Sequence, residues 1–280
     1  MADKYNHDYF KVSFPAEYVA VVEINRPEKL NAFMEVMWLN LEKVFNTLSE
    51  DPNVRAVVLT GAGDRAFCAG LDVQAAAQGQ LSDSNAGADG ARTATRLRRH
   101  IYEFQACITA IEKCEKPVIA VMHGISYGLA IDLALAADVR LASTDVRMSV
   151  KEVDIGLAAD IGTLNRLPHA GVSMSWIKEV ALTAREFGAE EALRVGLVSG
   201  IADGKHAVVK KATEMAALIA SKSPVAVQGT KELINYSRGR TVEESLNYTA
   251  VWNAGMLQTQ DMKDAMTAGL RKKKVSFAKL

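Results

Sequence analysis

Three acidic residues stand in an apolar part of the sequence and could do proton-transfer chemistry. Asp132 is the one charged residue in ISYGLAIDLALA, and Glu152 and Asp160 follow it in the segment KEVDIGLAAD. A buried carboxylate must be paired, be neutralised or take part in chemistry, so Asp132 is either the partner of a buried donor or a site carboxylate with a raised pKa. Nearby glycines put Glu152 and Asp160 on a loop, where acids are usually only solvated. Spacing alone therefore permits acid–base chemistry without establishing it.

Motifs for other chemistries are weak or missing in the sequence. Neither HExxH nor CxxC occurs, and the histidines are scattered, so we expect no metal site. Gly61, Gly63 and Ala66 have the GxGxxA spacing of a dinucleotide-binding loop. Such a loop must open a helix, whereas here another glycine, Gly70, follows within a few residues. We therefore expect no nicotinamide cofactor.

Composition limits the protein class. The chain has 280 residues, of which 49% are hydrophobic, and its 33 Lys and Arg balance 33 Asp and Glu. This composition excludes a disordered chain and gives no overall attraction to nucleic acid or anionic lipid. We expect no membrane span, since no apolar run is long enough, and no signal peptide at the N-terminus. The odd number of cysteines, Cys68, Cys107 and Cys114, favours a reducing compartment and core positions for these side chains.

Short β-branched runs alternate with helical patterns in the first half of the chain. The runs at 19–24, 54–59 and 118–122 predict buried strands. Apolar residues at helical spacing within 37–48 and 97–111 predict helices between them. The chain thus begins with a β-α-β arrangement.

The second half is predicted to be largely helical. From about residue 171 the pattern is mostly helical, with an apolar stripe over 208–219 and a further helix starting at Pro224. Residues 74–94 are rich in Ala, Gly, Gln and Ser and lack an apolar period. We expect them to form a mobile loop that contains at most a short helical piece.

Four segments, in order, resemble the enoyl-CoA hydratase/isomerase (crotonase) family. They are NRPEKLNAF at 25–33, VRAVVLTGAGDRAFCAGLDV at 54–73, KPVIAVMHGISYGLAIDLALAADVRLAS at 116–143 and GTLNRLP at 162–168. The resemblance implies an α/β fold, a spiral of repeated β-β-α turns with a helical C-terminal region. It also implies a core with an acyl-CoA site over 1–200 and a helical oligomerisation region over 201–280.

Within the family, residues 151–168 are similar to the stretch that marks the Δ3,5-Δ2,4-dienoyl-CoA isomerases. Those enzymes carry Asp, Glu and a further Asp eight residues later, a pattern that Asp132, Glu152 and Asp160 match. The resemblance implies conversion of 3,5-dienoyl-CoA to 2,4-dienoyl-CoA in the β-oxidation of unsaturated fatty acids. Our hypothesis is that Glu152 exchanges the proton at C2, Asp160 serves C6, and Asp132 positions them, with the first two roles interchangeable.

The resemblance also implies how the thioester is bound. The backbone N–H groups of Leu71 and Leu129 would form the oxyanion hole, and Leu30, Ala32 and Ala69 would lie along the CoA path. Where the family usually has three glycines, this chain has Gly128, Leu129 and Ala130, which suits the turn if the last two keep negative φ. CoA belongs to the substrate, so no cofactor is implied.

Two other functions and several partners stay open. The chain could be an enoyl-CoA hydratase or another acyl-CoA enzyme of the family, or a catalytically silent acyl-CoA-binding or assembly protein. The resemblance implies a homotrimer or homohexamer. The tail Ala278, Lys279, Leu280 resembles an SKL-type address, which predicts an import receptor as partner and the peroxisomal matrix as location. A frayed basic tail on a cytoplasmic protein is the alternative.

Overall fold

Two sheets form the centre of the protein. The computed structural model describes residues 3–5, 7–78, 89–270 and 275–280. Within them, one six-stranded sheet has the order β1-β2-β3-β5-β7-β10, and a four-stranded sheet has the order β4-β6-β8-β9. Neighbours run parallel except in the pairs β1 with β2 and β8 with β9. The strands are β1 Phe10–Ala16, β2 Val19–Ile24, β3 Ala56–Gly61, β4 Ala66–Cys68, β5 Val118–Met122, β6 Ile125–Tyr127, β7 Val139–Ser143, β8 Arg147–Ser149, β9 Phe187–Gly188 and β10 Gly200–Ala202.

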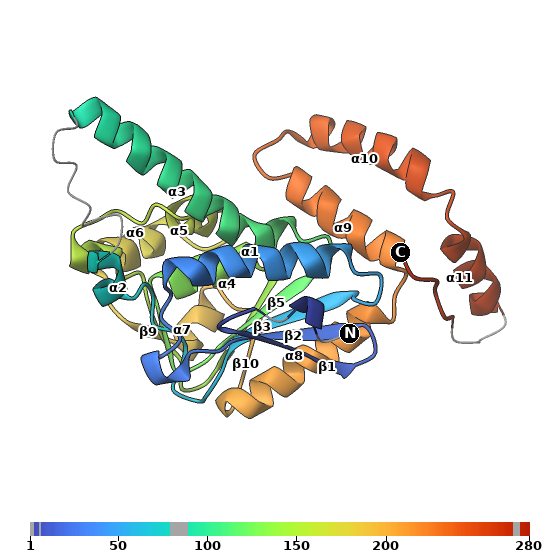
Figure 1. Ribbon diagram of the computed structural model, residues 1–280. Helices are drawn as coiled ribbons and strands as arrows, with labels where there is room; N and C mark the ends of the chain where they lie inside the picture. The colour runs from blue at the N-terminus through green and yellow to red at the C-terminus, as the bar shows by residue number, and fades with distance from the viewer. Residues whose placement is uncertain (1–2, 6, 79–88, 271–274) are drawn as a thin grey trace.

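The chain winds as a spiral, as predicted for this α/β fold. Each turn gives one strand to the larger sheet and the next to the smaller, in the pairs β3 and β4, β5 and β6, and β7 and β8. Helices then lead to the following turn (Figure 1). The helices are α1 Glu35–Glu50, α2 Val73–Gln78, α3 Gly90–Lys113, α4 Leu129–Ala136, α5 Thr163–Arg166, α6 Met174–Thr183, α7 Ala189–Arg194, α8 Gly204–Ala220, α9 Pro224–Tyr236, α10 Val242–Met256 and α11 Gln260–Leu270, with short 3-10 turns at Asp3–Tyr5, Pro27–Lys29, Glu152–Ile155 and Leu167–His169.

The predicted strands at 19–24 and 118–122 are confirmed, and the third begins later than predicted. Val54 follows α1 in a turn in which its N–H donates to the carbonyl of Asp51, so β3 starts at Ala56. All six residues of β3 are buried, as expected for a strand covered on both faces. After Gly63 the chain enters strand β4 and no helix opens there, which differs from a dinucleotide-binding loop.

Helices cover both faces of the larger sheet. Met37, Leu41 and Val44 of α1 pack on one face, and Val208 and Ala212 of α8 pack on the other (Figure 1). The three cysteines are buried free thiols in the core, as predicted. Within the described residues no helix has the length and apolar composition to cross a membrane.

The predicted C-terminal helices are present. Ser223 caps α9, whose first residue is Pro224, as expected. Tyr236 and Tyr248 stack with ring centroids 3.8 Å apart and join α9 to α10. The proposed boundary at residue 200 falls within β10, and α8 packs on the sheet, so the division at 200 stays a prediction.

The segment 74–94 contains more helix than predicted. Helix α2 reaches Gln78, and α3 already begins at Gly90, where Asp89 accepts a hydrogen bond from the N–H of Arg92. Residues 79–88, for which a mobile loop was predicted, lie outside the described residues.

Candidate active site

A cavity of about 280 Å³ lies at the N-terminal end of α4 and brings the three predicted acids together. Asp132, Glu152 and Asp160 line it, and so do Leu71 and Leu129. The rest of the wall is largely apolar, with Val73, Phe104, Ile155, Leu157 and Ile161 among its residues. This arrangement places carboxyl groups and backbone donors around one small, mostly apolar space.

Asp132 projects from α4 and is only 1% exposed. Its Oδ1 accepts a hydrogen bond of 2.5 Å from the N–H of Thr163, the first residue of α5. Burial raises the pKa of Asp132 to about 7, and the charge of Glu152 adds to this effect, while Thr163 and Arg166 oppose it. Asp132 therefore has both a buried donor as partner and a raised pKa.

Glu152 begins the 3-10 turn Glu152–Ile155 and lies against the turn before α4. A Cβ added to Gly128 would be 3.2 Å from its Oε1 and 4.0 Å from the Cα of Gly70. Its Oε2 is buried and has no hydrogen-bond partner among the described residues. Burial raises the pKa of Glu152, and the nearby charge of Asp160 raises it further. An unpaired, buried carboxylate oxygen of this kind can accept a proton from a bound molecule.

Asp160 lies on the loop before α5 and keeps contact with solvent while lining the cavity. Gln105 of α3 fixes the backbone there, because its Nε2 donates a hydrogen bond of 2.5 Å to the carbonyl of Asp160. Partial burial raises the pKa of the Asp160 carboxyl, and the charge of His100 opposes this shift. Asp160 is thus held by α3 and not by α4.

Two backbone N–H groups border the same cavity. Leu71 pairs with Phe33 in a parallel bridge, in which Phe33 N–H donates to Gly70 and Asp72 N–H donates to Phe33. In this pattern the N–H of Leu71 points away from Phe33. Leu129 is the first residue of α4, where a helix leaves its N–H without an internal partner. Within the described part of the chain, neither N–H donates a hydrogen bond to another protein group.

The backbone of the turn before α4 explains why Leu129 and Ala130 can stand where the family usually has glycines. Gly128 has φ +53°, in the left-handed region that favours glycine, whereas Leu129 and Ala130 are not among the residues with positive φ. Leu129 and Ala130 therefore fit the turn without strain, which confirms the condition set by the sequence. Gly128 is the position that must stay small.

The residues predicted along a CoA path lie beside the cavity. The N–H of Ala69, which lines the cavity, donates to the carbonyl of Leu30 over 3.0 Å. Arg26 Nη1 donates to the carbonyl of Ala32 and also to Asp72, each over 2.9 Å. Leu30 itself borders a separate cavity of about 180 Å³. Of the three residues, Ala69 alone lines the cavity that holds the acids, and the CoA path stays a prediction.

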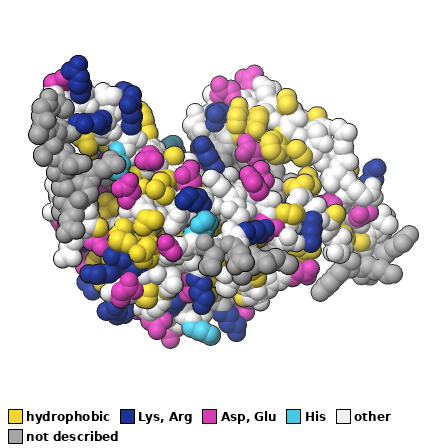
Figure 2. All heavy atoms as spheres, viewed as in Figure 1, with side chains coloured by type: hydrophobic (Ala, Val, Ile, Leu, Met, Phe, Trp, Pro, Cys, Tyr) yellow, Lys and Arg dark blue, Asp and Glu magenta, His cyan; other side chains and the backbone are white. Residues whose placement is uncertain are grey.

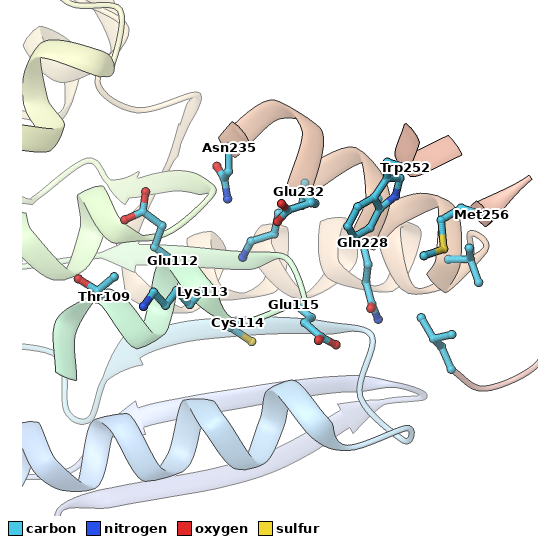
Figure 3. A pocket seen from close by; sticks show the side chains of 14 residues that line it. Thr109, Glu112, Lys113, Cys114, Glu115, Gln228, Glu232, Asn235, Trp252 and Met256 are labelled. Carbon is cyan, nitrogen blue, oxygen red and sulfur yellow. The ribbon is translucent and has the colours of Figure 1, made fainter. Parts of the chain in front are cut away.

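The tail residues lie elsewhere. Arg55, 7% exposed, donates to the carbonyls of Phe277 and Ala278 over 2.7 and 2.9 Å, and Lys279 Nζ donates to Asn53 over 2.6 Å. Leu280 is 54% exposed and borders a cavity of about 710 Å³ between α3, α9 and α10 (Figure 3). The predicted targeting tripeptide is thus docked on the body of the protein, away from the acids.

Sequence reasoning did not identify Gly162, Thr163 and Arg166, which contact or face Asp132. They fall in GTLNRLP, a segment that contributed to the family resemblance, so a signal was present although their roles could not be inferred. No cluster of three or more His, Cys, Asp or Glu suited to a metal ion occurs among the residues that the structure describes.

Comparisons with known proteins identify the family of this chain. The family model for enoyl-CoA hydratase/isomerase matches residues 16–279. A mitochondrial Δ(3,5)-Δ(2,4)-dienoyl-CoA isomerase of Mus musculus is 44% identical over 99% of this chain and 84% of that protein. A peroxisomal one of Arabidopsis thaliana is 42% identical over 92% and 91%.

A solved structure has the same fold. The crystal structure of an enoyl-CoA hydratase from Bacillus anthracis superposes with a TM-score of 0.85 at 27% identity and covers 97% of this chain and 99% of its own. The family model and the curated relatives extend over nearly the whole chain. The chain therefore belongs to the enoyl-CoA hydratase/isomerase family.

Proposed function

We propose that this protein is a Δ3,5-Δ2,4-dienoyl-CoA isomerase, which converts 3,5-dienoyl-CoA to 2,4-dienoyl-CoA in the β-oxidation of unsaturated fatty acids. The observation that carries the proposal is a single cavity with three carboxyl groups of raised pKa and two unpaired backbone donors. The similarity to named isomerases at 44% and 42% identity supports it. The same acids argue against a silent binding protein, which has no need of them.

The thioester oxygen would sit between the N–H groups of Leu71 and Leu129. Loss of the proton at C2 places negative charge on this oxygen, and two fixed donors stabilise that charge. Removing one such donor typically costs about 3–4 kcal/mol of transition-state stabilisation. The N-terminus of α4 adds a favourable dipole, since Leu129 is its first residue.

Two carboxyl groups would move the two protons. The base takes a proton from C2, the double bonds at C3–C4 and C5–C6 move to C2–C3 and C4–C5, and a proton is delivered to C6, so one proton leaves and one arrives. Glu152 suits C2 because it lies against Gly128, next to the oxyanion donor Leu129. Asp160 suits C6 because it belongs to a different loop, held by α3. Asp132 would position or tune the pair.

Substrate binding would use the path past Leu30, Ala32 and Ala69 for the CoA portion. The reaction has no net oxidation or reduction, so proton transfer by the acids is sufficient and no cofactor is needed beyond the CoA of the substrate. The apolar wall of Phe104, Leu157 and neighbouring residues would surround the diene.

Hydration is the second candidate activity, because the similar Bacillus anthracis structure is an enoyl-CoA hydratase. In the family's hydratases two glutamates handle a water, whereas this chain has the shorter Asp132 at the first position. One pair of assays separates the candidates. With 3,5-dienoyl-CoA we expect a rise in absorbance as the diene becomes conjugated with the thioester, with little hydration of crotonyl-CoA in parallel. Hydration without isomerisation would refute the isomerase.

We also infer that the protein is a homotrimer or homohexamer. Several large apolar side chains on the C-terminal helices are strongly exposed, including Ile234 at 60%, Leu246 at 63% and Val251 at 75%. Figure 2 shows hydrophobic side chains gathered over this region, across the hollow from α3. A patch of this kind is typical of a subunit interface. Sedimentation equilibrium would determine the mass, and a monomer at micromolar concentration would contradict the proposal.

The peroxisomal matrix is the proposed location, and the import receptor would be the partner of Ala278, Lys279 and Leu280. The similar Arabidopsis protein is peroxisomal, whereas the mouse protein is mitochondrial. Because Lys279 is bound to Asn53, the tail must leave its docking site before a receptor can read it. Removing the three residues from a fluorescent fusion should shift it to the cytoplasm, and unchanged peroxisomal fluorescence would refute the address.

A further inference from the structure

Arg166 is a charged side chain that the proton transfers described above do not use. It ends α5, and its side chain is 13% exposed. Its Nε donates to Glu112 Oε2 and its Nη2 to Thr109 Oγ1, each over 2.9 Å, and both partners lie on α3. Two directed hydrogen bonds hold the planar guanidinium in one orientation.

The remaining nitrogen of this guanidinium faces the site. A Cβ added to Gly162 would lie 1.9 Å from Arg166 Nη1 and 3.7 Å from Asp132 Oδ1. The guanidinium and the carboxylate therefore border the same small space, which stays free because Gly162 has no side chain. Gly162 also has φ +152°, so both its conformation and its surroundings favour glycine.

A carboxylate as buried as Asp132 is costly to ionise without a compensating charge. We propose that Arg166 is a positioning residue of the reaction: its guanidinium, fixed by Glu112 and Thr109, keeps the Asp132 carboxylate charged and in place beside Glu152. This inference rests on the proposed isomerase function, because Asp132 has a role only if the acids act together. The N–H of Thr163 fixes one oxygen of Asp132, and Arg166 supplies the positive charge.

The groups that face Asp132 come from several elements. Glu152 acts on it from the 3-10 turn. Cys68 of β4 is neutral, because burial raises the pKa of its thiol to about 12 and the charge of Asp132 adds to this effect. Tyr127 of β6 lines the same cavity and hydrogen-bonds to Glu186. On α3, Glu112 reaches Asp132 only through Arg166. Strand β5 carries no titratable residue. Asp160 and Lys151 line the cavity as well, and Lys151 is paired with Asp154. Arg166 is thus the cation that opposes the rise in the pKa of Asp132.

The structure supplies a matched control on the other side of Glu112. Arg238, which follows α9, donates from Nη1 to Glu112 Oε1 over 2.5 Å. Figure 3 shows Glu112 and Thr109 on α3 at the large cavity, across from Glu232 and Asn235 of α9. Arg238 therefore contacts the same anchor as Arg166 from the side away from Asp132. Replacing it removes an arginine without removing the charge at the site.

The test compares pH profiles of kcat for Arg166→Met, Arg166→Lys and Arg238→Met. An opposite charge within about 4–6 Å lowers the pKa of a carboxyl by about 1–3 units, and we take the lower end because Arg166 faces Asp132 without a hydrogen bond to it, so its loss raises the pKa of Asp132 from about 7 to about 8. At pH 7 the ionised fraction then falls from about one half to about one tenth. We expect activity of Arg166→Met to fall about five-fold at pH 7 and to recover towards pH 9, with Arg166→Lys between it and wild type and Arg238→Met unchanged.

A loss of the same factor at every pH, or an equal loss in Arg238→Met, would overturn the proposal in favour of a structural role. A second measurement follows the Asp132 carboxyl directly and does not depend on catalytic turnover. Carbon-13 NMR of aspartate-labelled protein, with Asp132→Asn to assign the signal, should show the Asp132 carboxyl titrating about one unit or more higher in Arg166→Met. An unmoved titration refutes the role of Arg166. Absence of isomerase activity in wild type, with the titration still shifted, refutes the proposed function instead.

Discussion

Replacing Asp160 with asparagine should separate the two proton transfers. The change removes the acid but keeps the backbone carbonyl to which Gln105 donates over 2.5 Å. Because the side chain is in contact with solvent, we expect the free energy of unfolding to change by less than about 0.5 kcal/mol. A positioned general acid contributes about 10²–10⁴-fold, or about 2.7–5.4 kcal/mol of activation free energy. Isomerisation should therefore slow by about that factor.

Exchange at C2 shows which step has been lost. In D₂O, proton NMR of the 3,5-dienoyl-CoA should show that Asp160→Asn still exchanges the C2 hydrogen, because Glu152 and both oxyanion donors are intact. Glu152→Gln should lose exchange and isomerisation together. If the exchange results were reversed, the two acids would have the opposite roles. Full isomerase activity in Asp160→Asn would refute any proton-transfer role for this residue.

Three further substitutions test other parts of the structure. Gly128→Ala should lower kcat and the midpoint of thermal unfolding, because φ +53° costs an L-residue about 1–2 kcal/mol and the new Cβ would lie 3.2 Å from Glu152 Oε1. Between pH 4 and pH 7, the free energy of urea unfolding should fall in wild type relative to Asp132→Asn. The reason is that a carboxyl whose pKa is raised in the folded state destabilises the fold as pH rises towards that pKa. Free energies that change in parallel with pH would contradict this. Arg55→Met should release the tail at Ala278 and speed its cleavage by carboxypeptidase, and an unchanged rate would show that Arg55 does not hold it.

The elements predicted well from the sequence are those whose residues are buried on all sides. The strands at 19–24 and 118–122 are β-branched runs with almost complete burial, so composition alone marks them. The helix predicted over 97–111 begins earlier, at Gly90. The prediction missed its first turns because they are exposed and lack an apolar period. Leu97, the first apolar residue of the predicted pattern, is 39% exposed. The N-terminal signal of this helix was its cap, Asp89, and not its hydrophobic pattern.

Candidate site residues could be predicted from the sequence where a charged residue stands among apolar ones. A lone carboxylate in an apolar run marks Asp132 as either the partner of a buried donor or a site carboxylate, and the family resemblance adds Glu152 and Asp160 to the candidates. The partners of Asp132 were not predictable in this way. Thr163 is 31 positions from Asp132 in the sequence, and Arg166 is held by residues of α3 more than 50 positions away. These contacts depend on how the turns of the spiral stack, and no local sequence pattern predicts that stacking.

The N-terminus of helix α4 brings the proposed oxyanion site and Asp132 close together, so their charges affect each other. Its first residue, Leu129, would stabilise the enolate oxygen, and Asp132 follows within the first turn. In the proposed mechanism Glu152 takes the C2 proton and negative charge moves from its carboxylate to that oxygen, so the total charge in the cavity would stay constant. A raised pKa makes Glu152 a stronger base, but a second unbalanced anion nearby would leave it protonated near neutral pH. A cation beside Asp132 satisfies both requirements, because it allows Asp132 to be ionised without adding net negative charge to the site.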